Sequence, residues 1–369
     1  MQMKNTIMVA ALLVTIIFFC LGCMSTEATE PQNNIQMNVE TENVTENANS
    51  SLGVPKVPRQ NLIVYSTPAK YSYQDLVSDI QQLQNLYGNI VQVSSLCTTL
   101  DGREVFDVTV GTGDNHILIF GAMHAREYIT IQIVMRQLCD AIDAMNGYGG
   151  TYQGISTAEL LQDVTIHFVP NSNPDGVAIS QFGLSSINSD SIRQKVSAMG
   201  GDFEQWKANA NGVDLNRNFD ADWQNYHGSQ YPSSERYKGI YPGIELESAA
   251  LIKLVKDYNV KRTISYHSCG EVIYWYYKQQ GAVFEESKRF AQRISGETGY
   301  YLDADYTALD PAGFKDWAVY KLGIPSLTIE TGAENGASIV APVPISRFNN
   351  IWQRNKNVVY ATIYNLKYE

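Results

Sequence analysis

The chain has 369 residues, of which 44% are hydrophobic, 18% charged and 11% aromatic, and its formal net charge is −11. The hydrophobic share can fill a large core, so a mostly disordered chain is excluded. The acidic balance disfavours binding to nucleic acid or an anionic membrane surface, because both require a basic face.

The first 60 residues are expected to lie outside that core. An apolar run over residues 7–21 is typical of an export signal and short for a membrane-spanning helix. It ends in Cys20-Leu21-Gly22-Cys23, which resembles a lipobox. We predict a lipoprotein-type export segment at 1–23, with lipid anchoring on Cys23; plain cleavage and an uncleaved anchor are the alternatives. The protein is therefore expected at the cell surface or secreted, touching the membrane only through this anchor.

Residues 24–60 are rich in Thr, Glu and Asn and almost free of bulky apolar side chains. Such a segment cannot bury enough surface to offset chain entropy, so it is predicted to be a disordered polar tether. The remaining residues, 61–369, would form the catalytic domain.

Helix and strand patterns alternate through that domain. Leu76, Ile80 and Leu83 recur at helical spacing, whereas short apolar or alternating runs indicate strands. This alternation predicts a mostly parallel α/β sheet covered by helices on both faces, with ligands bound beyond the carboxyl ends of strands. Helices are predicted at 73–87, 129–145, 245–258, 282–298 and 345–366, and strands at 105–110, 117–120, 164–169, 262–266 and 326–329.

Candidate metal ligands follow two of these strands. His124 and Glu127 come just after the strand at 117–120, three residues apart, so one turn can direct both at one point. His267 follows the strand at 262–266. Two imidazoles and a carboxylate are a ligand set typical of a catalytic zinc, which keeps a fourth position for water. Alone, the first pair is more often a surface polar motif, and His267 is what favours the metal site.

Two further polar groups suit the same chemistry. Glu330 ends the last apolar strand, where a carboxylate is costly unless it has a partner or a task. It is either a salt-bridged residue or, beside a zinc-bound water, a general base. Asn216 and Arg217 lie together in a polar loop, where the arginine can bind a carboxylate with two hydrogen bonds or form an ordinary ion pair.

Together these motifs resemble the zinc metallocarboxypeptidase family typified by pancreatic carboxypeptidase A. The similarity runs from about residue 71 to 366 and includes the HxxE motif at His124, SYHS around His267, VDLNRNF, and the strand glutamate Glu330. The resemblance implies a single α/β domain with a mixed, mainly eight-stranded central sheet flanked by helices on both faces.

By matching position, the resemblance also implies roles for individual residues. His124, Glu127 and His267 would bind one Zn2+ per chain, and Glu330 would be general base and then general acid. The residues that would hold the substrate, a peptide with a free C-terminal carboxylate, are Arg126, Asn216 and Arg217.

The sequence departs from the family pattern at two positions. The family arginine that precedes VDLNRNF is absent, and Lys207 is the nearest cation, with Arg193 a weaker candidate for the oxyanion donor. Tyr306 lies near the place of the mobile capping tyrosine, in a segment about two residues longer than usual.

Two specificity-pocket positions of the family fall on Lys278 and Lys315. Either both lysines point to solvent, or they make a cationic pocket for an acidic terminal group. WKANANGVDLNRNF and AGFKDW also look similar to bacterial γ-D-glutamyl-meso-diaminopimelate peptidases. We therefore expect a monomeric zinc carboxypeptidase acting on acidic or cell-wall-type peptides. A zinc amidase or deacylase on the same scaffold and a non-catalytic peptide-binding surface protein are the alternatives.

Overall fold

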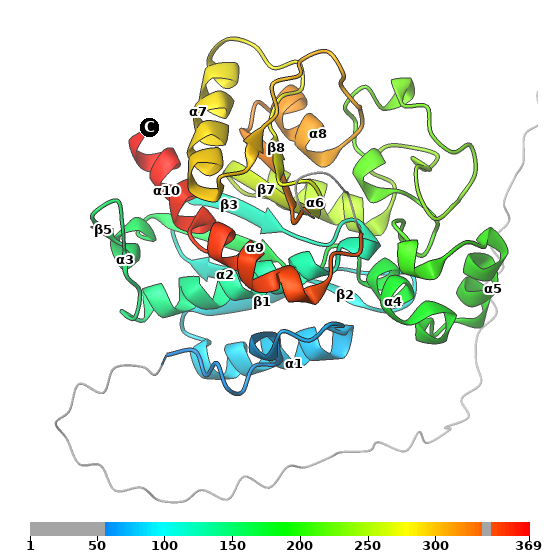
Figure 1. The fold of residues 1–369 in the computed structure, drawn as a ribbon, viewed down its shortest axis with the longest axis horizontal. Helices are drawn as coiled ribbons and strands as arrows, with labels where there is room; N and C mark the ends of the chain where they lie inside the picture. Colours follow the sequence, from blue (N-terminus) through cyan, green and yellow to red (C-terminus); the bar gives the residue numbers. More distant parts are fainter. Residues whose placement is uncertain (1–55, 334–340) are drawn as a thin grey trace, which may run out of the picture. The chain divides into compact units, whose positions relative to one another are not determined.

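The computed structural model describes residues 56–333 and 341–369, which form one α/β unit around a mixed eight-stranded sheet (Figure 1). The predicted export segment and residues 24–55 of the predicted tether lie outside the described residues. Val57 is already buried, and its backbone N–H donates to Asp143 Oδ1 at 2.8 Å, so the fold includes residues before 61. Among the described residues, no helix combines the length and apolar character that crossing a membrane requires.

The large sheet has the strand order β1-β2-β6-β3-β7-β10-β8-β9. Strands β6, β3, β7 and β10 are parallel to their neighbours in this central part, whereas β1, β2 and β8 add antiparallel pairings. The strands are β1 (Val91–Thr98), β2 (Glu104–Gly111), β3 (Asn115–Phe120), β6 (Val164–Val169), β7 (Val260–Ser268), β8 (Val272–Tyr274), β9 (Tyr301–Leu302) and β10 (Ser326–Thr331), with a small hairpin of β4 (Thr151–Tyr152) and β5 (Ile155–Ser156).

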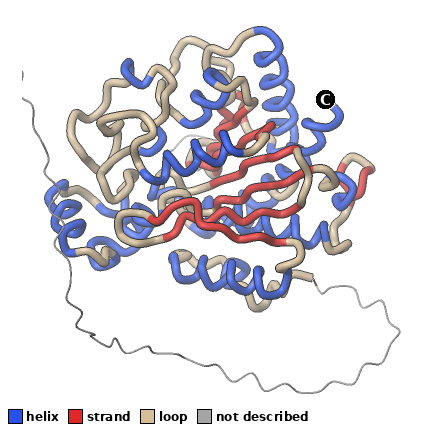
Figure 2. The backbone as a smooth tube through the Cα atoms, turned by 180° about the vertical axis from the view of Figure 1, so that it is seen from behind, coloured by secondary structure: helices blue, strands red, loops and turns tan. Residues whose placement is uncertain are grey.

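Helices cover both faces of this sheet, and Figure 2 shows the strands as a layer between them. The helices are α1 (Tyr73–Tyr87), α2 (Ile129–Met145), α3 (Thr157–Leu160), α4 (Pro174–Phe182), α5 (Asp190–Met199), α6 (Leu246–Asp257), α7 (Gly281–Thr298), α8 (Phe314–Lys321), α9 (Phe348–Asn355) and α10 (Val358–Tyr368).

Strand β3 shows how the two faces are filled. Ile117 and Ile119 pack in the core shared with α1, α2, α7, α9 and α10. Leu118 and Phe120 pack in a second core shared with α6 and α8. Successive side chains of a strand point to opposite faces, so an uninterrupted apolar run is what a central strand with two covered faces requires.

The predicted fold class is confirmed, and several element bounds agree closely. Helices α1 and α2 and strand β6 have the predicted bounds. The predicted closing helix at 345–366 is wrong in one respect, because it is broken into α9 and α10. The Asn355 carbonyl accepts a hydrogen bond from Gln137 Nε2 at 2.9 Å, and the buried Asn355 amide donates to Tyr300, so tertiary contacts replace the helical pattern there.

Candidate zinc centre and its cavity

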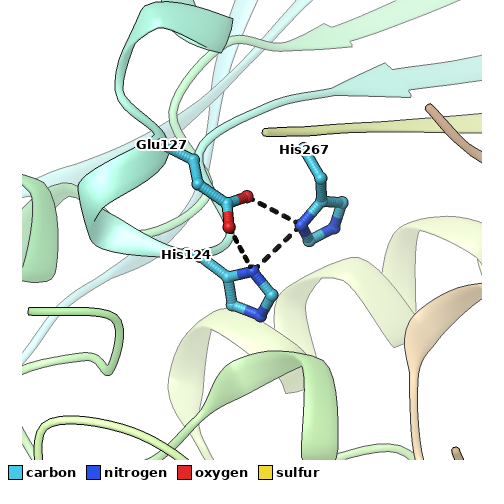
Figure 3. Close-up of side chains that lie close together, drawn as sticks. All are labelled: His124, Glu127 and His267. Carbon is cyan, nitrogen blue, oxygen red and sulfur yellow. Dashed lines mark hydrogen bonds and ion pairs between the residues drawn. The ribbon is translucent and has the colours of Figure 1, made fainter. Parts of the chain in front are cut away.

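Three side chains from two neighbouring strand ends converge on one point (Figure 3). His124 and Glu127 belong to the short turn that follows β3, and His267 is the penultimate residue of β7. His124 Nδ1 lies 2.9 Å from Glu127 Oε1 and 3.0 Å from His267 Nδ1, and His267 Nδ1 lies 2.9 Å from Glu127 Oε2. All three residues are buried.

This donor set fits a divalent zinc ion. Ligand atoms bonded to zinc at 2.0–2.1 Å in a tetrahedron lie about 3.3 Å apart, close to the separations of 2.9–3.0 Å between the ligand atoms of these three residues. Two Nδ1 atoms that face each other and a carboxylate cannot all be satisfied by protons, whereas one cation accepts a lone pair from each. Among the described residues, this is the one group of His, Cys, Asp and Glu side chains with the spacing of a metal site.

Neighbouring groups orient the ligands. His124 Nε2 lies 3.2 Å from Asp214 Oδ1, so the proton on Nε2 can be donated to this carboxylate while Nδ1 faces the metal position. The backbone N–H of Ser268 donates to Glu127 Oε2 at 3.1 Å. Burial alone would raise the pKa of Glu127, but the two imidazoles outweigh burial and lower the pKa, so the carboxylate stays ionised.

Glu330 lies beside this triad without belonging to it. It stands opposite His267 in the parallel register of β10 with β7, and it lines a cavity of about 480 Å³ together with His124. Within the described part of the chain, its carboxylate accepts no hydrogen bond. Burial, followed by the charge of Glu127, raises the pKa of Glu330 to about 7. A carboxyl group with this pKa can both take and return a proton near neutral pH.

Lys207 occupies the wall of the same cavity. Its Nζ lies 3.8 Å from Asp214 Oδ2, which draws the ammonium toward the metal position. Arg193, the weaker candidate for this role, instead pairs with Asp190 on α5. Of the two candidate cations, Lys207 is therefore the one that lines the cavity.

Asn216 and Arg217 lie on a one-turn helix, Leu215–Arg217, and both line the cavity. Asn216 Oδ1 accepts the backbone N–H of Phe314 at 3.0 Å, which leaves the amide NH2 of Asn216 for another acceptor. Arg217 Nη1 donates to the carbonyl of Asn216 at 2.7 Å, and Nη2 pairs with Asp310. Burial would lower the pKa of Arg217, but the carboxylates of Asp214 and Asp310 outweigh it and raise the pKa.

The structure does not bring Arg126 into the lining of this cavity. Its Nη1 donates to the Gln205 carbonyl at 3.2 Å and lies 3.5 Å from Glu235 Oε2. The predicted substrate-binding role of Arg126 therefore lacks the placement that Asn216 and Arg217 have.

Of the two lysines at the predicted pocket positions, one lines the cavity and the other does not. Lys315 lines the cavity, where its Nζ donates to the Tyr276 carbonyl at 2.9 Å and pairs with Asp316. Lys278 lies outside the cavity lining, because its exposed ammonium lies 2.5 Å from Asp222 Oδ2. Of the two lysines predicted to make the pocket cationic, only Lys315 lines this cavity.

Tyr306 also lies outside the cavity lining. Its ring packs against that of Tyr276, with centroids 4.8 Å apart, and against Trp275 at 5.9 Å. The capping role expected for Tyr306 stays a prediction.

Several residues that line or support the cavity do not belong to the site predicted from the sequence. Asp303, Asp305 and Asp310 line it from the loop between β9 and α8, and Asp214 supports His124. The aspartates recur in the loop sequence DADYTALD, just before the AGFKDW motif, and that recurrence was the available signal. Asp214 precedes Asn216 by two residues inside VDLNRNF.

Comparisons with known proteins agree with this centre. The zinc carboxypeptidase family model matches residues 76–358. The chain is 30% identical over 299 residues to the gamma-D-glutamyl-L-diamino acid endopeptidase 1 of Lysinibacillus sphaericus, covering 80% of this chain and 72% of the relative.

Solved structures show the same fold. Bovine thrombin-activatable fibrinolysis inhibitor, in complex with tick carboxypeptidase inhibitor, superposes with a TM-score of 0.64 at 21% identity, covering 82% of this chain and 99% of that chain. The carboxypeptidase A of Helicoverpa armigera gives 0.62 at 19% identity, covering 80% and 74%. The resemblance found in the sequence is confirmed, and the chain belongs to the zinc carboxypeptidase family, whose members are metallopeptidases.

Proposed function

We propose that this protein is a zinc metallocarboxypeptidase that hydrolyses the C-terminal bond of peptides and prefers acidic or cell-wall-type substrates with γ-glutamyl and diaminopimelate groups. The observation that carries the proposal is the placement of Glu330. This carboxylate stands opposite His267 in the register of β10 with β7 and lines the same cavity as His124, and it has no hydrogen-bond partner among the described residues. A group so placed is suited to move protons in the reaction.

In the proposed hydrolysis, the residues of the cavity have different roles. Zinc, when bound, acidifies a coordinated water toward a pKa near 7 and polarises a carbonyl group. Glu330 accepts the proton of the attacking water and returns it to the nitrogen of the leaving amine. Lys207 supplies a positive charge where the carbonyl oxygen becomes negative. Asn216 and Arg217 hold the terminal carboxylate, which fixes which end of the peptide enters.

Cavity charge supports the substrate preference. The half of diaminopimelate that would enter the pocket carries both an ammonium and a carboxylate group. Lys315 offers a cation to that carboxylate, and the aspartates of the β9–α8 loop offer acceptors to the ammonium. The relative named gamma-D-glutamyl-L-diamino acid endopeptidase supports the same substrate class. Export through residues 1–23 and anchoring on Cys23 would bring the enzyme to such peptides at the cell surface.

Release of terminal residues from a peptide panel tests this proposal. The panel contains L-alanyl-γ-D-glutamyl-meso-diaminopimelate and α-peptides that end in Glu, Phe or Arg. We expect diaminopimelate and Glu to be released fastest, activity to stop with a zinc chelator, and activity to return with added zinc. Faster release of Phe or Arg would reject the substrate preference, and activity that survives the chelator would reject the zinc mechanism.

A zinc amidase or deacylase on the same scaffold is the second candidate. The two candidates differ in whether the substrate must have a free C-terminal carboxylate. The presence of Asn216 and Arg217 favours the carboxypeptidase, which requires one. A peptide and its C-terminal amide should differ in kcat/KM, with the free acid hydrolysed faster. Equal kcat/KM values for the free acid and the amide would reject the carboxypeptidase assignment in favour of the amidase. A non-catalytic binding protein would hydrolyse neither.

A further inference from the structure

The arginine proposed to bind the substrate already has an acidic partner from the protein. Asp310, in the loop between β9 and α8, pairs with Arg217 Nη2 inside the cavity lining. Arg217 Nη1 is used by the carbonyl of Asn216 at 2.7 Å, and the buried Nε finds no hydrogen-bond partner among the described residues. Asp310 therefore holds the terminal nitrogen of the guanidinium that a substrate carboxylate would also need.

The backbone ties Asp310 to the segment that carries Arg217. The N–H of Ala312 donates to the Ala221 carbonyl at 2.9 Å, and the N–H of Phe219 donates to the Ala312 carbonyl at 3.1 Å. Phe314 N–H is bound by Asn216 Oδ1 at 3.0 Å. The pairing of Asp310 with Arg217 follows from these anchors on both segments.

The two partners differ in how firmly they are held. The Arg217 side chain is 15% exposed and its guanidinium lies 5.0 Å from the Tyr226 ring, whereas the Asp310 side chain is 62% exposed. An ion pair with one exposed partner contributes little, so an incoming carboxylate can replace Asp310. Without Asp310, a bound substrate that lacks a carboxylate would leave the mostly buried Arg217 guanidinium with no carboxylate at hydrogen-bond distance among the described residues.

We propose that Asp310 is a specificity-determining residue that reduces the requirement for a free C-terminal carboxylate. Asp310 neutralises Arg217 when the bound peptide continues past the cavity or ends in an amide. When the peptide ends in a carboxylate, that carboxylate replaces Asp310 as the partner of Arg217. Peptides of both kinds then enter the same site. The inference rests on the proposed function, because it takes Arg217 as the group that binds the terminal carboxylate.

Matched substrates test this role. Values of kcat/KM are measured for a peptide and its C-terminal amide with the wild type, Asp310→Asn and Asp310→Ala. Removing the competing charge should raise the ratio of acid to amide by roughly two- to fivefold in both variants, the range set by an exposed ion pair. Asp190→Asn removes the charge of an exposed aspartate that pairs with Arg193 on α5, outside the cavity lining, and should leave the ratio at the wild-type value. An unchanged ratio in both Asp310 variants overturns the inference.

A double-mutant cycle with Arg217→Met assigns the effect to the pair. In that background, Asp310→Asn should leave the ratio unchanged, and a rise there would also overturn the inference. Failure of the proposed function has a different signature: wild-type hydrolysis would persist with chelator, or the wild type would hydrolyse the amide at least as fast as the acid. An unchanged ratio in Asp310 variants that remain zinc-dependent and prefer the free acid refutes only the role of Asp310.

Discussion

Glu247, near the start of α6, is a buried carboxyl group whose ionisation should control stability. Its two oxygens each lie 3.4 Å from Asn209 Nδ2, and Glu245 shares that amide at 2.8 Å. Burial, together with the charges of Glu245 and Asp175, raises the pKa of Glu247 to about 8 from the ordinary value of 4.5. The folded protein therefore keeps a proton on Glu247 at a pH where the unfolded chain has released it.

The direction and size of the effect follow from proton linkage. The folded-state pKa is the higher one, so the stabilising contribution is complete below pH 4.5 and is lost as pH rises through 8. Each pH unit between the two values is worth about 1.4 kcal/mol, so the free energy of unfolding falls by up to about 5 kcal/mol. Glu247→Gln has nearly the same shape and cannot ionise, so it removes this dependence.

Urea unfolding at pH 5, 7 and 9 measures the effect, with zinc saturating in every sample. The wild type should lose stability relative to Glu247→Gln as pH rises, and pH effects common to both proteins cancel in the difference. Asp257→Asn, at the exposed end of the same helix, should show the wild-type pH dependence. Parallel curves for the wild type and Glu247→Gln would refute the reasoning.

Two further predictions concern the zinc centre. Glu330→Gln should retain zinc and lose about 10²- to 10⁴-fold in kcat, because the amide cannot carry the proton; zinc content and turnover are measured together, and near wild-type turnover would contradict the role of Glu330. Asp214→Asn should weaken zinc binding about 10- to 100-fold, because His124 loses its charged partner. Competition with a chromophoric chelator measures that affinity, and wild-type binding would mean that another group orients His124.

The parts of the fold that depend on local patterns could be predicted from the sequence. Leu76, Ile80 and Leu83 at helical spacing indicated α1, and the strand pattern at 164–169 indicated β6. The three candidate ligands could be found because each follows a predicted strand, and parallel strands bring their carboxyl ends to one edge.

The features that could not be predicted from the sequence depend on contacts between segments that are distant in the chain. The break between α9 and α10 arises from the Asn355 carbonyl and Gln137, which are far apart in the chain. Lys278 and Lys315 are both lysines at plausible pocket positions, and only tertiary contacts separate them. The pairing of Asp310 with Arg217 depends on where a loop is anchored, which no local periodicity reports.

The parallel register of β10 with β7 sets Glu330 directly across from His267. A shift by one residue would turn the Glu330 side chain to the other face of the sheet, so the ladder of backbone hydrogen bonds fixes Glu330 and His267 relative to each other. Asp303, Asp305 and Asp310 belong instead to the loop between β9 and α8. Under the proposed function, insertions or exchanges in that loop would change which molecules are accepted without moving Glu330 relative to His267, so selectivity would evolve separately from reactivity.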